Sequence, residues 1–89
     1  MDIADSARKH QVEDRFGDDD IVHVLEHPLY VADDEDDWDK ALYLGPDRAG
    51  RLLEVVVAVR ADGTEVAIHA MRMRPAYEPL LRQSGGEDA

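Results

Sequence analysis

Residues 52–71 read LLEVVVAVRADGTEVAIHAM, and this stretch decides the fold. Leu52 to Arg60 is dense in valine and leucine, which predicts a central strand covered on both faces. One face is expected to carry Leu53, Val55, Val57 and Val59, packed against a helix at Asp19–His27, and the other Val56 and Ala58. Ala61–Thr64 contains Asp-Gly, a pair that accepts the positive φ of a tight hairpin turn. Glu65 to Met71 then returns as an antiparallel strand. Its predicted inward side chains are Val66, Ile68 and Ala70, and its reverse face carries Ala67, His69 and Met71.

Two further strands are expected before this hairpin. Leu29–Val31 has a β-prone composition, and so does the segment from Trp38 to Gly45. The residues between Gly45 and Gly50 include Pro46 and form a turn rich in helix and strand breakers. Four strands joined in sequence by short turns predict an antiparallel meander, with its strongest strand in the middle.

Helices are expected in the sequence before and after the predicted strands. Asp2 to His10 has short helical spacing, and Asp19–His27 places apolar residues at helical spacing and ends before Pro28. Pro75 suits the first turn of a last helix that extends to Gln83. The sequence therefore predicts one α+β domain over residues 1–83, with two N-terminal helices, four strands and a C-terminal helix. Residues 84–89 are expected to form a disordered tail.

The net charge of −11 is concentrated in one block of the chain. Between Glu13 and Asp39, twelve carboxylates stand against Arg15 alone, so this block carries the whole net charge. Such a block is a solvated face, an adaptation to high salt or a docking surface for a basic partner. The predicted partner-binding residues are Tyr30, Asp33, Asp34, Asp36, Asp37 and Trp38.

Several classes of protein are excluded or disfavoured by what the sequence lacks. No stretch approaches the roughly 20 apolar residues that span a bilayer, and the first residues do not resemble a signal peptide. The chain has no cysteine, which fits a reducing cytoplasm. His23 and His27 have the i, i+4 spacing of metal ligands but lack a third ligand in sequence, so no metal or other cofactor is expected. Because 89 residues bury a modest core, an oligomer or a bound partner is expected.

Four stretches carry a resemblance to a known family. They are ARKHQV at residues 7–12, DIVHVLEHPL at 20–29, LYLGPDRAGRLLEVVV at 42–57 and VAIHAMRMRP at 66–75. In order and spacing they resemble the BrnT-type toxins of bacterial toxin–antitoxin systems, whose fold is similar to the RelE-type ribonucleases. The chain differs from that pattern in lacking the usual extended segment before the first helix. Gln11 stands for a glycine, and His69 and Met71 stand for a serine and an arginine.

The resemblance implies a cytoplasmic messenger-RNA endoribonuclease that needs no metal and is inhibited by an antitoxin. The antitoxin would be a small ribbon-helix-helix or helix-turn-helix protein, in a homodimer or hetero-oligomer. The family's basic positions map onto Lys9, His10, Arg51 and Arg72. A catalytically inactive protein-binding module of the same fold is the alternative, favoured by the loss of basic residues and by the charge. A small protein with a partner unrelated to toxins is a third reading.

Metal-independent RNA cleavage needs a base, an acid and positive charge at the phosphate. Histidine titrates near neutral pH, and the planar fork of arginine matches phosphate. The predicted catalytic residues are His69, Arg72, Tyr77 and His10, and the predicted RNA-binding residues are Arg8, Lys9, Arg51 and Arg74. Each also has a plainer explanation. The arginines can be exposed strand-end charges, His69 a packed side chain, His10 a partner of the helix dipole, and Tyr77 a core residue.

Overall fold

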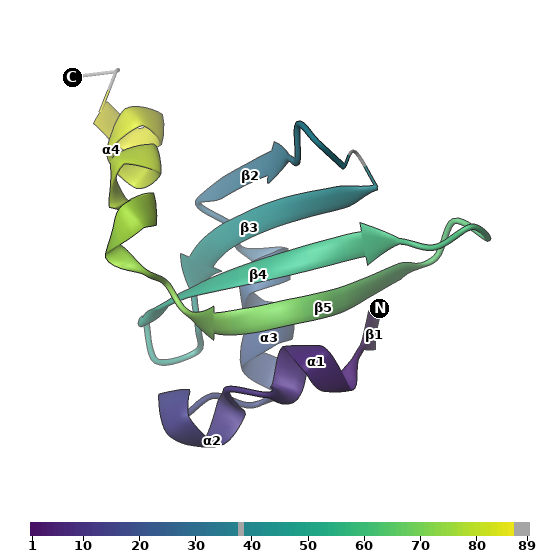
Figure 1. Cartoon of the computed structure of the whole chain (residues 1–89). Coiled ribbons are helices and arrows are strands. Elements are labelled where there is room, and N and C mark those ends of the chain that lie inside the picture. The colour runs from purple at the N-terminus through teal and green to yellow at the C-terminus, as the bar shows by residue number, and fades with distance from the viewer. Residues whose placement is uncertain (38, 87–89) are drawn as a thin grey trace.

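The computed structural model describes residues 1–37 and 39–86. It contains a five-stranded mixed sheet in the order β1-β5-β4-β3-β2 (Figure 1). The strands are β1 (Asp2–Ile3), β2 (Tyr30–Asp33), β3 (Lys40–Pro46), β4 (Leu52–Val59) and β5 (Glu65–Arg72). The four longer strands pair antiparallel in sequence order, and β4 is central as predicted. The sheet is not a pure meander, because β1 pairs in parallel with β5.

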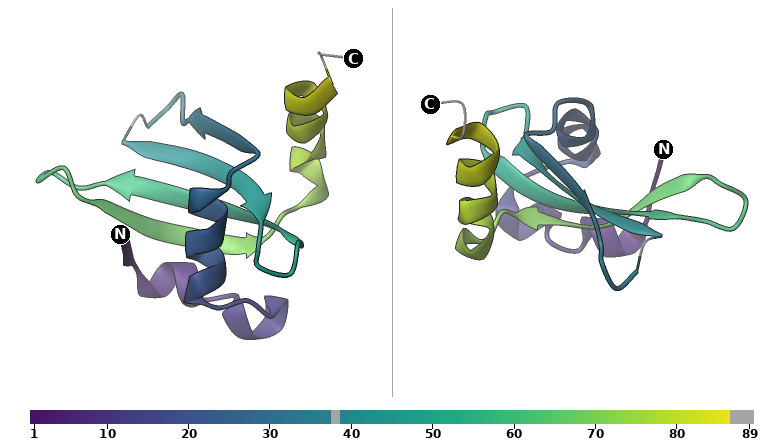
Figure 2. Two further views of the ribbon diagram at one scale, coloured as in Figure 1. Left: turned by 180° about the vertical axis from the view of Figure 1, so that it is seen from behind. Right: turned by 90° about the horizontal axis from the view of Figure 1, so that it is seen from above.

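The helices before the sheet residues cover one face and one edge of the sheet. They are α1 (Asp5–Arg8), α2 (Gln11–Asp14) and α3 (Asp18–Glu26). Figure 2 shows α3 crossing the sheet, where it contacts β3 and β4, while α1 and α2 lie along β5. We call the sheet surface under α3 the helix face and the opposite surface the open face. No described helix is long and apolar enough to cross a membrane.

The core lies between α3 and the central strands. Ile21 and Val24 of α3 are fully buried together with Leu53 and Val55 of β4, and Val57 is almost fully buried. Alternate residues of a strand point to opposite faces, so Glu54 and Val56 belong to the open face. The predicted packing of the second helix on Leu53, Val55 and Val57 is therefore confirmed. Val59, predicted on the same buried face, is 44% exposed because it is the last residue of β4.

The N-terminal segment differs from the single helix predicted over Asp2–His10. Asp2 and Ile3 extend along β5 opposite Val66 and Ala67, and the chain turns helical only at Asp5. His10 has φ −102° and ψ 4°, which separates α1 from α2. Three short helical pieces therefore precede β2, and the two-helix prediction is wrong. The free edge of β5 explains the difference, because its unpaired backbone groups offer the N-terminus a strand partner.

A β-bulge in β5 changes which side chains face inward. The register with β4 shifts between Val56, opposite His69, and Val57, opposite Ala67, so Ile68 has no direct partner. Ala67 and Ala70 are both fully buried in the core, although the alternation predicted Ala67 on the reverse face. A bulge adds one residue to one strand, and this breaks the period of two. His69 keeps its predicted place on the reverse face.

The C-terminal helix is confirmed in kind but shifted along the chain. Pro75–Tyr77 forms a short 3-10 helix, η1, and α4 follows as Glu78–Gly86. The helix therefore includes residues 84–86, which were predicted as tail, and residues 87–89 lie outside the described part. In Figure 1, α4 stands at the end of the sheet where β2 begins and β5 ends.

A buried carboxylate fastens the start of α3 to the turn between β3 and β4. Asp20 Oδ2 accepts the backbone N–H of Gly17 at 2.8 Å, and Oδ1 accepts the backbone N–H and Nε–H of Arg48 at 3.1 and 3.0 Å. Burial alone would raise the pKa of Asp20, but the bonds from Arg48 and Gly17 outweigh it and lower the pKa from 3.8 to about 2. The ionised carboxylate therefore stabilises the fold.

This carboxylate predicts a pH-dependent difference between the protein and its Asp20→Asn variant. Because the folded pKa is depressed, the stabilisation is present above about pH 4 and is lost as the pH falls through about 2. At neutral pH the variant should be less stable by about 2 kcal/mol. Urea unfolding at several pH values measures this gap. Asp19→Asn, whose side chain is 81% exposed, is the control and should change little. An unchanged gap between pH 5 and pH 2 contradicts the assignment.

Candidate functional site

A buried glutamate organises the polar groups of the open face. Glu54 is only 1% exposed, although it lies in the middle of the apolar strand β4. Its Oε1 accepts the backbone N–H and Nε–H of Arg74 at 3.1 and 3.0 Å. Its Oε2 accepts Nη2–H of Arg74 at 2.7 Å and lies 3.0 Å from His69 Nε2. Both oxygens are therefore satisfied, as the burial of a carboxylate requires.

The charge of Glu54 determines which ring nitrogen of His69 carries a proton. Burial alone would raise the pKa of Glu54, but the hydrogen bonds from Arg74 and His69 lower it below 4.5. The ionised carboxylate can only accept hydrogen bonds, so Nε2 of His69 carries a proton. In the neutral imidazole, Nδ1 is then the free acceptor. The contact with Glu54 therefore holds the imidazole ring by its Nε2 atom.

Two more predicted catalytic residues lie beside this pair. The rings of His10 and His69 have centroids 6.3 Å apart in an edge-to-face arrangement, although 58 residues separate them in sequence. The Arg74 guanidinium carbon lies 5.6 Å from the centroid of the Tyr77 ring. Glu54, His69, Arg74, His10 and Tyr77 form what we call the Glu54 cluster. It combines two imidazoles with a guanidinium that is 54% exposed.

Arg72, predicted as catalytic, lies outside this cluster. Its position opposite Leu53 in the register puts its side chain on the helix face. There its guanidinium donates to the backbone carbonyl oxygens of Asp14 and Arg15, and to Oδ2 of buried Asp47 at 2.9 Å. Its backbone N–H donates to Asp14 Oδ2 at 3.0 Å. Arg72 therefore ties α2 and the β3–β4 turn to the end of β5.

This bonding predicts a structural effect for Arg72→Ala. The change leaves Asp47 and two carbonyl oxygens short of a donor, which should cost about 2–4 kcal/mol of stability. Chemical denaturation of the purified variant measures the loss. Arg82→Ala removes an equally charged but 71% exposed side chain of α4 and should change stability by less than about 1 kcal/mol. Equal stability of the two variants would contradict the structural role of Arg72.

The predicted RNA-binding residues do not form one surface. Arg8 pairs with Asp18 at 2.9 Å and with Asp5 at 3.3 Å, so its charge is largely balanced. Arg51 donates to the Arg15 carbonyl and lies 3.7 Å from Asp47 Oδ2. Lys9 is exposed between α1 and α2, one residue before His10. Of the predicted RNA-binding residues, Arg74 thus belongs to the Glu54 cluster, and Lys9 is the sequence neighbour of its member His10.

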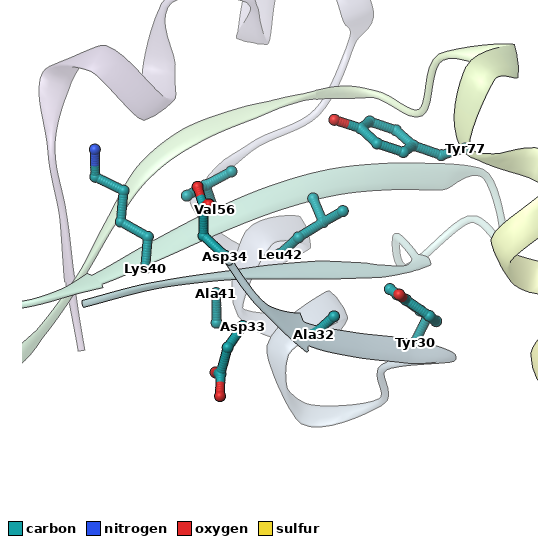
Figure 3. A pocket seen from close by; sticks show the side chains of 9 residues that line it. All are labelled: Tyr30, Ala32, Asp33, Asp34, Lys40, Ala41, Leu42, Val56 and Tyr77. Carbon is teal, nitrogen blue, oxygen red and sulfur yellow. The ribbon is translucent and has the colours of Figure 1, made fainter. Parts of the chain in front are cut away.

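Part of the predicted partner-binding set lines a groove on the open face. The groove has a volume of about 290 Å³ and is bordered by Tyr30, Asp33 and Asp34 of that set, although the Asp33 carboxylate points away from the other two toward the helix face (Figure 3). Asp36 is exposed and Asp37 half-buried in the turn between β2 and β3. Trp38 lies outside the described residues. Tyr77 also lines this groove, so the groove and the Glu54 cluster share one side chain.

The sequence interpretation did not include the functional candidate Glu54 or the buried structural carboxylate Asp47. A signal for Glu54 was present, because a lone acid inside a valine- and leucine-rich central strand must find a buried partner. Asp47 offered no such signal, since it stands in a turn of Gly, Pro and Asp that also suits an exposed residue.

No metal site is found among residues 1–37 and 39–86, where no group of three ligating side chains comes together. The rings of His23 and His27 are 4.7 Å apart, and His23 Nδ1 lies 2.8 Å from the Pro46 carbonyl oxygen. That contact occupies one ring nitrogen of His23 and connects α3 to β3. This histidine pair therefore has a packing role in the structure.

Comparison with known proteins identifies no relative: no family model, no curated protein and no solved structure matches the chain.

Proposed function

We propose that this chain is the toxin component of a type II toxin–antitoxin system and cleaves messenger RNA without a metal. The observation that carries the proposal is the Glu54 cluster, in which a carboxylate-oriented His69 lies beside His10 and Arg74. The resemblance to BrnT-type toxins adds support.

The proposed reaction is an attack by the RNA 2′-hydroxyl on the adjacent phosphate. Nδ1 of His69 takes the 2′-hydroxyl proton, and the 2′-oxygen forms a bond to phosphorus. The bond from phosphorus to the 5′-oxygen breaks, and protonated His10 donates a proton to that oxygen. The products are a 2′,3′-cyclic phosphate and a 5′-hydroxyl, so atoms and charge balance.

Arg74 and Tyr77 have supporting roles in this scheme. The Arg74 guanidinium supplies positive charge where the pentacoordinate phosphate accumulates negative charge. The Tyr77 ring beside it offers a surface on which a base can stack. Lys9 adds a second positive charge near His10.

The proposal is tested with purified protein and single-stranded RNA in the presence of EDTA. We expect cleavage that leaves 2′,3′-cyclic phosphate ends, and slower growth when the protein is expressed in bacteria. Co-expression of the neighbouring open reading frame, if it encodes a small DNA-binding protein, should restore growth. Intact RNA under these conditions, with no effect on growth, would overturn the proposal.

The same fold acting as a catalytically inactive binding module is the second candidate. It is favoured by the commitment of Arg74 to Glu54 through three hydrogen bonds and by the net charge of −11. A strongly negative protein repels RNA unless the charge lies away from the bound strand. Measured RNA affinity separates the two functions, because a ribonuclease must bind RNA at low salt.

A further inference from the structure

The groove on the open face has an apolar floor that the described chain leaves uncovered. Leu42 and Val56 lie opposite each other on β3 and β4, and Ala32 of β2 continues the same row. Tyr30 and Tyr77 close one end, as Figure 3 shows. All five side chains are half-buried. The groove can therefore accept an aliphatic side chain from outside.

The other end of the groove is strongly acidic. Residues 33–40 hold six carboxylates and one ammonium group, that of Lys40, so this segment carries a charge of −5. Lys40 lines the groove, but its Nζ lies 3.2 Å from Asp37 Oδ2. Asp34 borders the groove and is exposed. A ligand that fills the groove therefore meets an apolar floor next to unbalanced negative charge.

The groove also lies next to an edge of the sheet. β2 is the last strand in that direction among the described residues, and Tyr30–Asp33 pairs only with β3. The outer backbone groups of an edge strand are available to an added strand. A polypeptide segment can thus bind by backbone hydrogen bonds while its side chains enter the groove.

We propose that this groove docks an extended segment of a protein partner, rich in arginine or lysine and carrying an aliphatic anchor. The anchor packs on Leu42 and Val56, and the basic side chains pair with Asp34 and the acids of residues 35–37. RNA is disfavoured because its phosphates are repelled by this segment. A second copy of this chain is disfavoured because each copy carries a net charge of −11.

Docking here has a consequence for the Glu54 cluster. Tyr77 lines the groove, and its ring lies 5.6 Å from the Arg74 guanidinium carbon. A segment seated against Tyr77 therefore restricts access to Arg74. This inhibitory consequence rests on the proposed ribonuclease function, whereas the docking itself does not.

The test measures binding of a synthetic probe in the absence of RNA. The probe is a fluorescently labelled short peptide of alternating leucine and arginine, and a leucine–glutamate peptide is its counterpart. Fluorescence anisotropy should detect binding of the arginine peptide alone. Affinity should fall steeply between about 0.01 and 1 M salt, as the Debye length shrinks from about 30 to 3 Å. Binding of both peptides, or of neither, would overturn the proposal.

Two pairs of variants locate the binding site. Asp34→Asn with Asp36→Asn should weaken binding at low salt at least about fivefold, whereas Glu13→Gln with Glu26→Gln changes net charge equally and should not. Ala32→Tyr should weaken binding by filling the groove, whereas Val31→Tyr points to the other face of β2. Equal effects within either pair would overturn the proposal.

Sedimentation shows whether a second copy occupies the groove instead. Dimerisation abolished by Ala32→Tyr would also overturn it.

Discussion

His69→Ala should reduce RNA cleavage at least about 100-fold, because general acid–base catalysis contributes about 10²–10⁴-fold. In the proposed reaction His69 takes the 2′-hydroxyl proton, and Glu54 holds its ring in place through a 3.0 Å contact with Nε2. The substitution removes the base. Glu54 keeps three hydrogen bonds from Arg74, so the variant should remain folded. Initial rates of cleavage of a defined RNA measure the loss.

A second substitution separates catalysis from packing. His69→Gln retains a side-chain donor for Glu54 but cannot take up a proton near neutral pH. It should therefore melt close to the wild-type protein and be as inactive as His69→Ala. The control His27→Ala removes an exposed histidine at the end of α3, the helix that covers the helix face, and should keep full activity. Cleavage by His69→Gln at the wild-type rate would move the base elsewhere.

The largest effect on stability is expected for Val57→Asp. Val57 is 2% exposed on the central strand and packs in the core with Ile21 and Val24 of α3. The new carboxylate would be buried without a partner, which costs several kcal/mol. A domain of this size has a stability of about 5–10 kcal/mol, so the variant should be largely unfolded at 37 °C. Circular dichroism and thermal melting measure the outcome.

The same strand supplies the control for this prediction. Val59→Asp introduces the same carboxylate two residues later on the same face, where the side chain is 44% exposed. Its cost should be below about 1 kcal/mol, because the carboxylate stays in water. If Val57→Asp melts at the temperature of Val59→Asp, the assignment of the core to this face of β4 is wrong.

The contrast between Val57 and Val59 shows how far the two-residue period of a strand predicts which side chains are buried. Alternation correctly assigned Leu53, Val55 and Val57 to the buried face, because apolar residues on one face of a strand pack against a covering helix. It could not give the length of sheet that α3 covers. That length depends on where the nine residues of α3 cross the strands. Val59 lies beyond the covered part.

The candidate site, too, was predictable from the sequence only in part. Histidine and arginine near the end of β5 were recognisable as chemistry-bearing residue types in the sequence. The partners of these side chains depend on the strand face. Arg72 points to the helix face and binds Asp47, whereas His69 lies on the open face beside Glu54. A one-residue difference in register exchanges these faces, and the bulge at Ile68 is a feature that composition does not predict.

The sequence by itself determined the four longer strands, their antiparallel order and the α3 helix, because local hydrophobic periodicity and turn residues specify them. It also placed the whole excess of negative charge in one block. Tertiary structure alone decided that residues 2–3 form a fifth strand, that Arg72 binds Asp47 on the helix face and that His10 approaches His69. These features depend on contacts between residues far apart in the chain. The free edge of β5 and the buried carboxylate of Asp47 find partners from distant parts of the chain, and no local sequence pattern encodes those partners.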